Sequence, residues 1–142
     1  MKLELSQVID RPSAEVFRFI ATNHVQNHPR WDPKMELHQL TDGPMGVGTV
    51  IHRRHTHAGF PQEGTMEIVE FEADRAFGMV ISDGPIEMHS RMTFEPEGAH
   101  ATRIKASLDV PSMADPMDPS PIEESMRRMK ELIETEPTPA RS

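Results

Sequence analysis

The side chains most able to do chemistry are concentrated in one short run, His52-Arg53-Arg54-His55-Thr56-His57. A histidine titrates near neutral pH and can transfer a proton, and an arginine can hold a carboxylate or polarise a carbonyl group. If the run is a strand, alternate side chains share a face. One face then carries Ile51, Arg53, His55 and His57, and the other carries Val50, His52, Arg54 and Thr56.

Two interpretations of this run stay open. In the first, Arg53, His55 and His57 face an interior cavity, where the arginine polarises a substrate and a histidine acts as acid or base. In the second, the run is a solvated strand end whose positive side chains offset nearby carboxylates. The two interpretations differ in which face of the strand is buried.

Two histidine pairs have spacings that could hold a metal ion. His55 and His57 would share a strand face, and His24 and His28 would share a helix face. Neither spacing supplies a third ligand, and the chain has no cysteine. We therefore expect no metal site and no cofactor.

Strands must position most of these residues. Alternation of apolar and polar residues, interrupted by turn signals, predicts strands over residues 2–9, 35–40, 49–57, 65–72, 76–82, 86–95 and 102–110. Period-two patterning of this kind is typical of antiparallel strands that are packed on one side only.

Three helices are expected as well. Pro12 and Glu15 favour a short helix over residues 13–21, and a second piece over 23–29 would end at Pro29. A proline-rich connector over 111–121 then leads to Ser120-Pro121-Ile122-Glu123, where Ser120 is the predicted N-cap of a long helix. Its apolar residues recur at helical spacing: Ile122, Met126, Met129 and Ile133.

Composition limits the possible classes of protein. The 142 residues fit one domain, predicted over 1–136, with a flexible tail at 137–142. Lys and Arg number 15 against 23 Asp and Glu, for a formal charge of −8, so nucleic-acid binding is not expected. The apolar runs are too short to span a membrane. The start of the chain lacks an apolar signal-peptide core and cysteine is absent, so we expect a cytoplasmic protein.

Four local motifs occur in a fixed order along the chain. They are Ile9-Asp10-Arg11-Pro12 before Val16-Phe17, then Trp31-Asp32-Pro33, Gly46-Val47-Gly48-Thr49 and Val69-Glu70-Phe71-Glu72. In this order and spacing, the chain resembles the START-like (SRPBCC) superfamily over residues 2–135, particularly its polyketide cyclase/dehydrase-like branch.

The resemblance implies an α+β helix-grip fold of the Bet v 1 type. In this fold a curved seven-stranded antiparallel sheet grips a long C-terminal helix, two short helices follow strand 1, and an apolar cavity lies between sheet and helix. Members bind lipids, sterols, polyketides or plant hormones, and some catalyse cyclisation or dehydration. In related folds, the strand after a Gly-x-Gly-Thr turn points inward the side chains that share a face with the threonine. Here that would turn Arg53, His55 and His57 toward the cavity.

The expected function is binding of a hydrophobic small molecule in this cavity, by a monomer or a homodimer. The alternative is a polyketide cyclase/dehydratase-like enzyme that uses Arg53, His55 and His57. The chain contains 11 Met, whose flexible side chains fit irregular apolar shapes. The residues expected to line the cavity are Trp31, Ile51, Met88, Met92, Phe94, Ile104, Ala106, Leu108, Met126, Met129 and Ile133.

Overall fold

Seven strands form one antiparallel sheet in the computed structural model, which describes residues 1–137. The strands are β1 (Lys2–Ile9), β2 (Met35–Gln39), β3 (Val50–His55), β4 (Gln62–Glu72), β5 (Ala76–Asp83), β6 (Ile86–Glu97) and β7 (Ala101–Asp109). Their order across the sheet is β1-β7-β6-β5-β4-β3-β2. A register shift between Ile68 and Glu70 of β4 marks a bulge, which adds to the curvature of the sheet.

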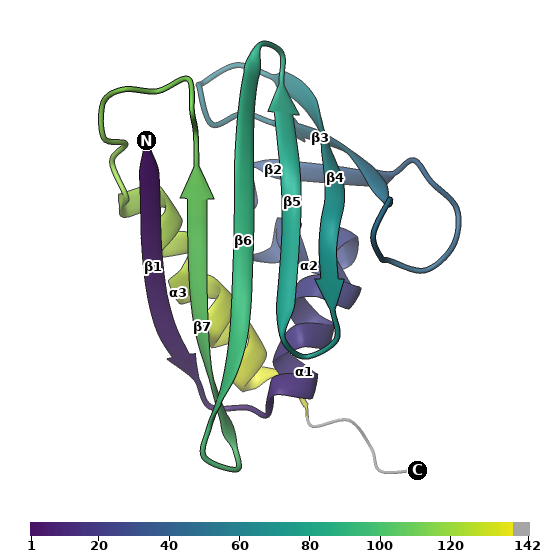
Figure 1. Ribbon diagram of the computed structural model, residues 1–142, viewed down its shortest axis with the longest axis vertical. Helices are drawn as coiled ribbons and strands as arrows, with labels where there is room; N and C mark the ends of the chain where they lie inside the picture. The colour runs from purple at the N-terminus through teal and green to yellow at the C-terminus, as the bar shows by residue number, and fades with distance from the viewer. Residues whose placement is uncertain (138–142) are drawn as a thin grey trace.

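All the helices lie on one side of the sheet (Figure 1). They are α1 (Ser13–Phe17), the π-helical turn η1 (Arg18–Thr22), α2 (His24–Trp31) and α3 (Ser120–Thr135). Helix α3 buries Met126, Met129 and Ile133 on one side and exposes its charged residues on the other. The helix-grip architecture expected from the resemblance is confirmed: a strand, two short helices, six strands and a long helix. Within residues 1–137, no helix combines the length and hydropathy needed to cross a membrane.

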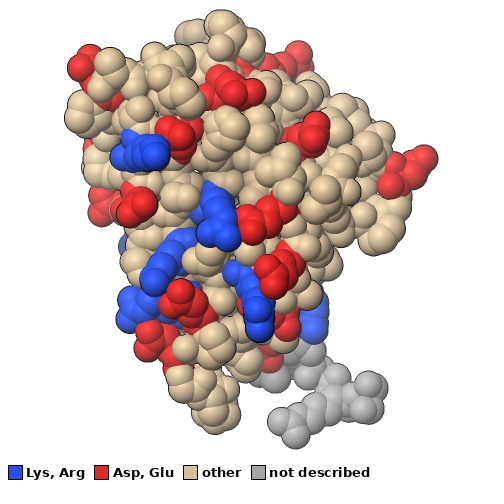
Figure 2. Space-filling model, viewed as in Figure 1, with Lys and Arg blue, Asp and Glu red and all other residues tan. Residues whose placement is uncertain are grey.

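The outer face of the sheet is a solvated face of paired charges. Acidic and basic side chains lie beside one another on it (Figure 2). Ion pairs link the strands: Glu70 of β4 and Arg91 of β6 pair at 2.7 Å across β5, and Glu95 of β6 and Lys105 of β7 pair at 3.3 Å. Such exposed pairs contribute little stability individually. A binding site for an apolar molecule is therefore expected on the inner face of the sheet, under the helices.

Two predicted element ends were wrong, one of a helix and one of a strand. Helix α2 does not end at Pro29 but continues to Trp31. A proline removes only its own N–H, and the helix resumes where the Asp32 N–H donates to the His28 carbonyl at 2.9 Å. Strand β3 ends at His55, two residues earlier than expected, because Gly59 takes a positive φ of 87° in the turn that follows.

Two element starts also differ from the prediction. Strand β4 begins at Gln62 rather than at residue 65, because Gln62 still pairs with His55. Helix α3 begins at Ser120, but its hydroxyl does not cap the helix. The Asp118 carboxylate accepts both the Ser120 N–H at 3.0 Å and the Ser120 hydroxyl at 2.8 Å. The tail expected at 137–142 lies, beyond Pro137, outside the described residues.

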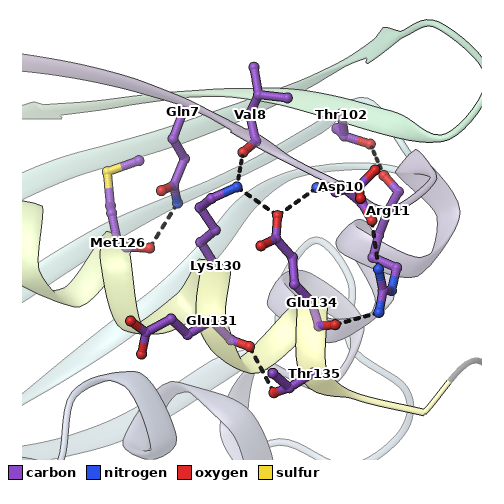
Figure 3. Close-up of polar contacts among 10 residues, drawn as sticks. All are labelled: Gln7, Val8, Asp10, Arg11, Thr102, Met126, Lys130, Glu131, Glu134 and Thr135. Atoms are coloured by element: carbon purple, nitrogen blue, oxygen red, sulfur yellow. Dashed lines mark hydrogen bonds and ion pairs between the residues drawn. The ribbon is translucent and has the colours of Figure 1, made fainter.

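Polar contacts fasten α3 to the edge strand β1 (Figure 3). The Lys130 ammonium donates to the Val8 carbonyl at 2.7 Å and to the Glu134 carboxylate at 2.6 Å. Glu134 also accepts the Asp10 N–H at 2.8 Å, while the Arg11 guanidinium donates to the Glu134 carbonyl. These contacts satisfy backbone groups at the sheet edge and fix the position of α3 over the inner face.

We expect Glu134→Gln to lower the free energy of unfolding by about 1 kcal/mol, because it replaces charge-assisted hydrogen bonds to Lys130 and Asp10 with weaker neutral ones. Urea denaturation measures the change. Glu131→Gln is the control, since that side chain is 62% exposed on the same helix. Equal stabilities of the two variants would contradict the role assigned to this contact.

Candidate functional site

The floor of a cavity is formed by two rows of inward side chains that cross the sheet. The strand register places Leu3, Leu108, Ser90 and Met79 in the first row. It places Leu5, Ala106, Met92 and Phe77 in the second. Helix α3 covers both rows with Ile122, Ser125, Met126 and Met129. The walls are thus mostly apolar and come from elements far apart in the sequence.

The cavity has a volume of about 210 Å³. Ile81 and Ile20 extend its apolar wall, and α2 closes one end with His24, His28, Trp31 and Asp32. Sites for drug-sized molecules typically measure about 300–1,000 Å³. This cavity is smaller, so it suits a molecule of one or two rings.

Six of the residues expected at the cavity do line it: Trp31, Met92, Ala106, Leu108, Met126 and Met129. Five others do not: Ile51, Met88, Phe94, Ile104 and Ile133. Phe94 and Ile104 are paired across β6 and β7 one row beyond the cavity floor. There Phe17 of α1 packs edge-on against Phe94 at 5.2 Å and fills the space.

Ile133, Ile51 and Met88 lie outside the cavity for related reasons. Ile133 belongs to the same solid core under the C-terminal half of α3. Ile51 is fully buried in a row with Met66 of β4, and this row reaches Met88 through Ile81. The alternation of each strand thus predicts the inward face, but packing of the helices decides where that face is left uncovered.

The histidines at the cavity end are positioned by the junction between η1 and α2. In the π-turn the Asn23 N–H donates to the Arg18 carbonyl at 2.9 Å, and carbonyl groups near such a helix end lack regular partners. The His24 side chain meets one of them, with Nδ1 2.8 Å from the Ile20 carbonyl oxygen. Asn27 meets another by donating to the Phe19 carbonyl at 2.9 Å.

His24 and His28 lie on one face of α2, as their spacing suggested, but they bind each other. Nδ1 of His28 is 3.0 Å from Nε2 of His24. The nitrogens that would have to ligate a shared metal are therefore hydrogen-bonded together. Residues 1–137 contain no group of three or more His, Asp or Glu side chains placed to hold a metal ion.

Burial keeps both histidines neutral. It lowers the pKa of His24 from 6.5 to about 4, although the hydrogen bond to the Ile20 carbonyl acts in the opposite direction. Burial also lowers the pKa of His28, and positive charge on His24 and Arg53 would lower it further. The cavity end therefore presents imidazole rather than imidazolium groups at neutral pH.

Asp32 connects this end to His57. The His57 Nε2 lies 2.8 Å from Asp32 Oδ2, and His28 Nε2 lies 4.0 Å from the same oxygen. His57 follows the end of β3 in a turn, with a side chain that is 39% exposed, and it does not line the cavity. The expectation that it continues the inward face of the strand was wrong because the strand has already ended.

Arg53 and His55 are buried on the inner face of β3, but they form a separate cluster with Asp83 of β5. Asp83 Oδ1 is 3.3 Å from Arg53 Nε, and Oδ2 is 3.0 Å from His55 Nε2. Among the described residues, Arg53 Nε, His55 Nδ1 and Asp83 Oδ1 have no hydrogen-bond partner of good geometry. Burial lowers the pKa of Arg53, and Asp83 opposes this effect. None of the three lines the cavity.

This cluster exists because β4 carries no side chain at Gly64. Gly64 pairs with Arg53 in the register, and β5 is the next strand. A methyl group at Gly64 would overlap the Ser82 carbonyl oxygen and the Asp83 carboxylate. The gap lets the carboxylate extend across β4 to the side chains of β3.

Several lining residues escaped the sequence-based prediction. Leu3 and Leu5 lie on the inward parity of β1, so the alternation could have identified them. His28 and Asp32 follow His24 at intervals of four residues, a helical spacing that points to one shared face. Ser90 and Ser107 gave no signal, because a serine that lines a cavity resembles any polar strand residue.

The chain thus combines a helix-grip fold with a mostly apolar cavity between the sheet and the C-terminal helix. The chain matches the family described as polyketide cyclase/dehydrase and lipid transport over residues 1–134, and it belongs to that family. A comparison with curated protein sequences gives no match.

Solved structures share the fold at low sequence identity. Norcoclaurine synthase from Thalictrum flavum aligns with a TM-score of 0.74 and 15% identity, over 97% of this chain and 89% of that chain. Major latex-like protein 151 from Panax ginseng gives 0.72 and 15%, over 94% and 95%. A Chromobacterium violaceum protein gives 0.71 and 14%, over 95% and 98%. At these identities the likeness shows the fold alone.

We expect Gly64→Ala to lower the free energy of unfolding by about 1–3 kcal/mol, the usual cost of overpacking a fitted site. The added methyl group displaces the Asp83 carboxylate from Arg53 and His55. Gly46→Ala is the matched control, because a methyl group there meets nothing within 4 Å. Urea denaturation of both variants tests this, and equal stabilities would show that the gap at Gly64 is not needed.

The lowered pKa of His24 makes stability depend on pH. The unfolded chain takes up a proton near pH 6.5, whereas the folded protein does so only near pH 4. The contribution of His24 is therefore complete above pH 6.5 and is lost as the pH falls toward 4. At about 1.4 kcal/mol per pKa unit, the loss amounts to about 3 kcal/mol.

His24→Asn tests this dependence, since it keeps a donor for the Ile20 carbonyl and removes the titration. We expect the unfolding free energy of this variant to fall less between neutral pH and pH 4 than that of the unchanged protein. His100→Asn alters an exposed histidine and should leave the slope unchanged. An unchanged slope in His24→Asn would contradict the assignment.

Proposed function

We propose that this protein binds a small hydrophobic molecule in the cavity between the sheet and α3. The observation that carries the proposal is the continuous apolar wall, supplied by strands β1, β5, β6 and β7 and by α3 around about 210 Å³ of space. Removing apolar surface from water contributes about 25 cal/mol per Å². A ligand of matching size gains this contribution on the part of its surface that the wall covers.

The neighbours in the family support a ligand of this size. The structure of norcoclaurine synthase contains dopamine and hydroxybenzaldehyde, two molecules with one aromatic ring each. In the present protein, Met92, Met126 and Met129 supply flexible thioether side chains to the wall. Such side chains adapt to ring faces at little cost.

An enzymatic function through Arg53, His55 and His57 has less support. None of the three side chains lines the cavity. Arg53 and His55 are engaged with Asp83, and the histidines that line the cavity are His24 and His28. Burial lowers the pKa of His28, which makes it a weak base at neutral pH and favours binding over proton abstraction.

We expect Met92→Trp and Met126→Trp to weaken binding of p-xylene or indole by at least about tenfold, because an indole ring at either position fills most of the cavity. Isothermal titration calorimetry measures the dissociation constants. Met88→Trp is the matched control, because Met88 lies on the same strand as Met92 but does not line the cavity.

Equal binding by all three variants would show that the ligand site is elsewhere. Extraction of the freshly purified protein, followed by mass spectrometry, then identifies any natural ligand. The unchanged protein also offers an internal probe, since its single tryptophan, Trp31, lines the cavity and its fluorescence should change when a ligand enters.

A further inference from the structure

The direction of each hydrogen bond at the polar end of the cavity is fixed by a backbone carbonyl. The Ile20 carbonyl oxygen can only accept, so Nδ1 of His24 carries the proton. A neutral imidazole has one N–H, so Nε2 of His24 is an acceptor. The proton between the two rings therefore belongs to Nδ1 of His28. Nε2 of His28 is left with a free lone pair.

This lone pair lies close to a second acceptor. Nε2 of His28 is 4.0 Å from Asp32 Oδ2, and both residues line the cavity. A bare imidazole nitrogen and a carboxylate oxygen cannot hydrogen-bond each other, because neither has a proton. Asp32 Oδ2 accepts from His57, but a carboxylate oxygen can accept more than one hydrogen bond. His28 Nε2 and Asp32 Oδ2 thus present two acceptors side by side at this end of the cavity.

We propose that the bound molecule is a small apolar ring compound with a hydroxyl or amino group that donates a hydrogen bond to Nε2 of His28, beside Asp32. The inference rests on the proposed function and specifies the chemical class of its ligand. A group that only accepts, such as an ether, leaves both lone pairs unmet. A carboxylate is in addition repelled by Asp32.

Two further features hold His28 in this state. The Trp31 ring stacks on the His28 ring, with centroids 5.1 Å apart and an interplanar angle of 19°, which fixes the direction of Nε2. Burial lowers the pKa of His28, so Nε2 does not take up a proton and become a donor at neutral pH. Ser90, Ser107 and Ser125 also line the cavity, and their hydroxyls can donate or accept. The test must therefore separate the contribution of His28 to binding from that of the serine hydroxyls.

Four ligands of one ring each make the test. They are p-xylene, p-cresol, p-toluidine and 4-methylanisole, which carry a methyl, a hydroxyl, an amino and an ether group on the same framework. Calorimetry gives their dissociation constants for the unchanged protein, for His28→Phe and for the control His38→Phe on the exposed face of β2. His28→Phe retains an aromatic ring against Trp31 and removes the lone pair.

We expect His28→Phe to weaken the binding of p-cresol and p-toluidine by about five- to tenfold relative to that of p-xylene, which is the effect of losing one hydrogen bond. The ratio of the dissociation constants of p-xylene and 4-methylanisole should stay the same. His38→Phe should leave all four dissociation constants unchanged. Equal losses for all four ligands, or none, would overturn the inference while leaving the proposed function intact. Failure of all four to bind the unchanged protein would overturn both.

Nitrogen NMR keeps the inference testable if His28→Phe does not fold. Two-bond proton–nitrogen correlation in the unchanged protein distinguishes protonated from bare ring nitrogens. We expect His28 to show a protonated Nδ1 and a bare Nε2, and the Nε2 signal to shift on addition of p-cresol but not of p-xylene. A proton on Nε2 would overturn the inference.

Discussion

Uneven covering of the inner face of the sheet is the constraint from which the rest of the structure follows. A curved antiparallel sheet with one apolar face must bury that face, and within residues 1–137 its cover is formed by the short helices after β1 and by one long helix. Phe17 of α1 fills the space over Phe94. The rows of Met79 and Met92 are not filled in this way, and a cavity remains between them and α3.

The position of α3 decides how large that cavity is. The helix is held at the edge strand by Lys130 and Glu134, whose side chains use backbone groups that β1 would otherwise present to water. These contacts lie along the C-terminal half of the helix, next to the solid core. The N-terminal half, with Ile122 and Met126, covers the cavity instead. One helix thus covers a solid core with its C-terminal half and a cavity with its N-terminal half.

Polar groups at the inner face are costly, and each is tied to a specific backbone feature. His24 is buried because it completes the hydrogen bonding of a π-turn. Arg53 is buried because Gly64 leaves a path for the carboxylate of Asp83. A buried ion pair of this kind contributes little net stability, since desolvation offsets the attraction. Loss of either partner nevertheless leaves a buried charge unpaired and is strongly destabilising. The pair therefore fixes the spacing of β3, β4 and β5.

The sequence predicted the strands and the inward face of each, because alternation reports directly which side chains are buried. Leu5, Ala106 and Met92 belong to one row for this reason. Alternation does not report how far a helix extends over a face, so Phe94 and Ile104 were expected at the cavity although α1 covers them.

The polar sites were harder to predict than the strands. The predicted strand over residues 76–82 stops just before Asp83, which is the last residue of β5 and reaches across a strand. Gly64 lies just before the predicted strand over residues 65–72, and the need for a gap there arises from its neighbours in space. His24 and His28 were recognised as a pair, but their chemistry depends on the Ile20 carbonyl, which no side-chain pattern reveals.

Apolar walls and a polar end contribute differently to selectivity. An apolar cavity discriminates weakly between ligands that differ by one methylene group, by about 1–3 kcal/mol, because the wall adapts. Methionine side chains weaken this discrimination further. An acceptor buried beside a ligand discriminates more strongly, because a ligand without a donor leaves the lone pair without water and without a partner.

The neutral state of His28 is therefore as important as its position. An imidazolium at the same place would donate instead of accept, and it would attract carboxylates rather than reject them. Burial of the ring acts against that state. The selectivity proposed for the cavity thus depends on the Ile20 carbonyl, which sets the proton positions on His24 and, through it, on His28.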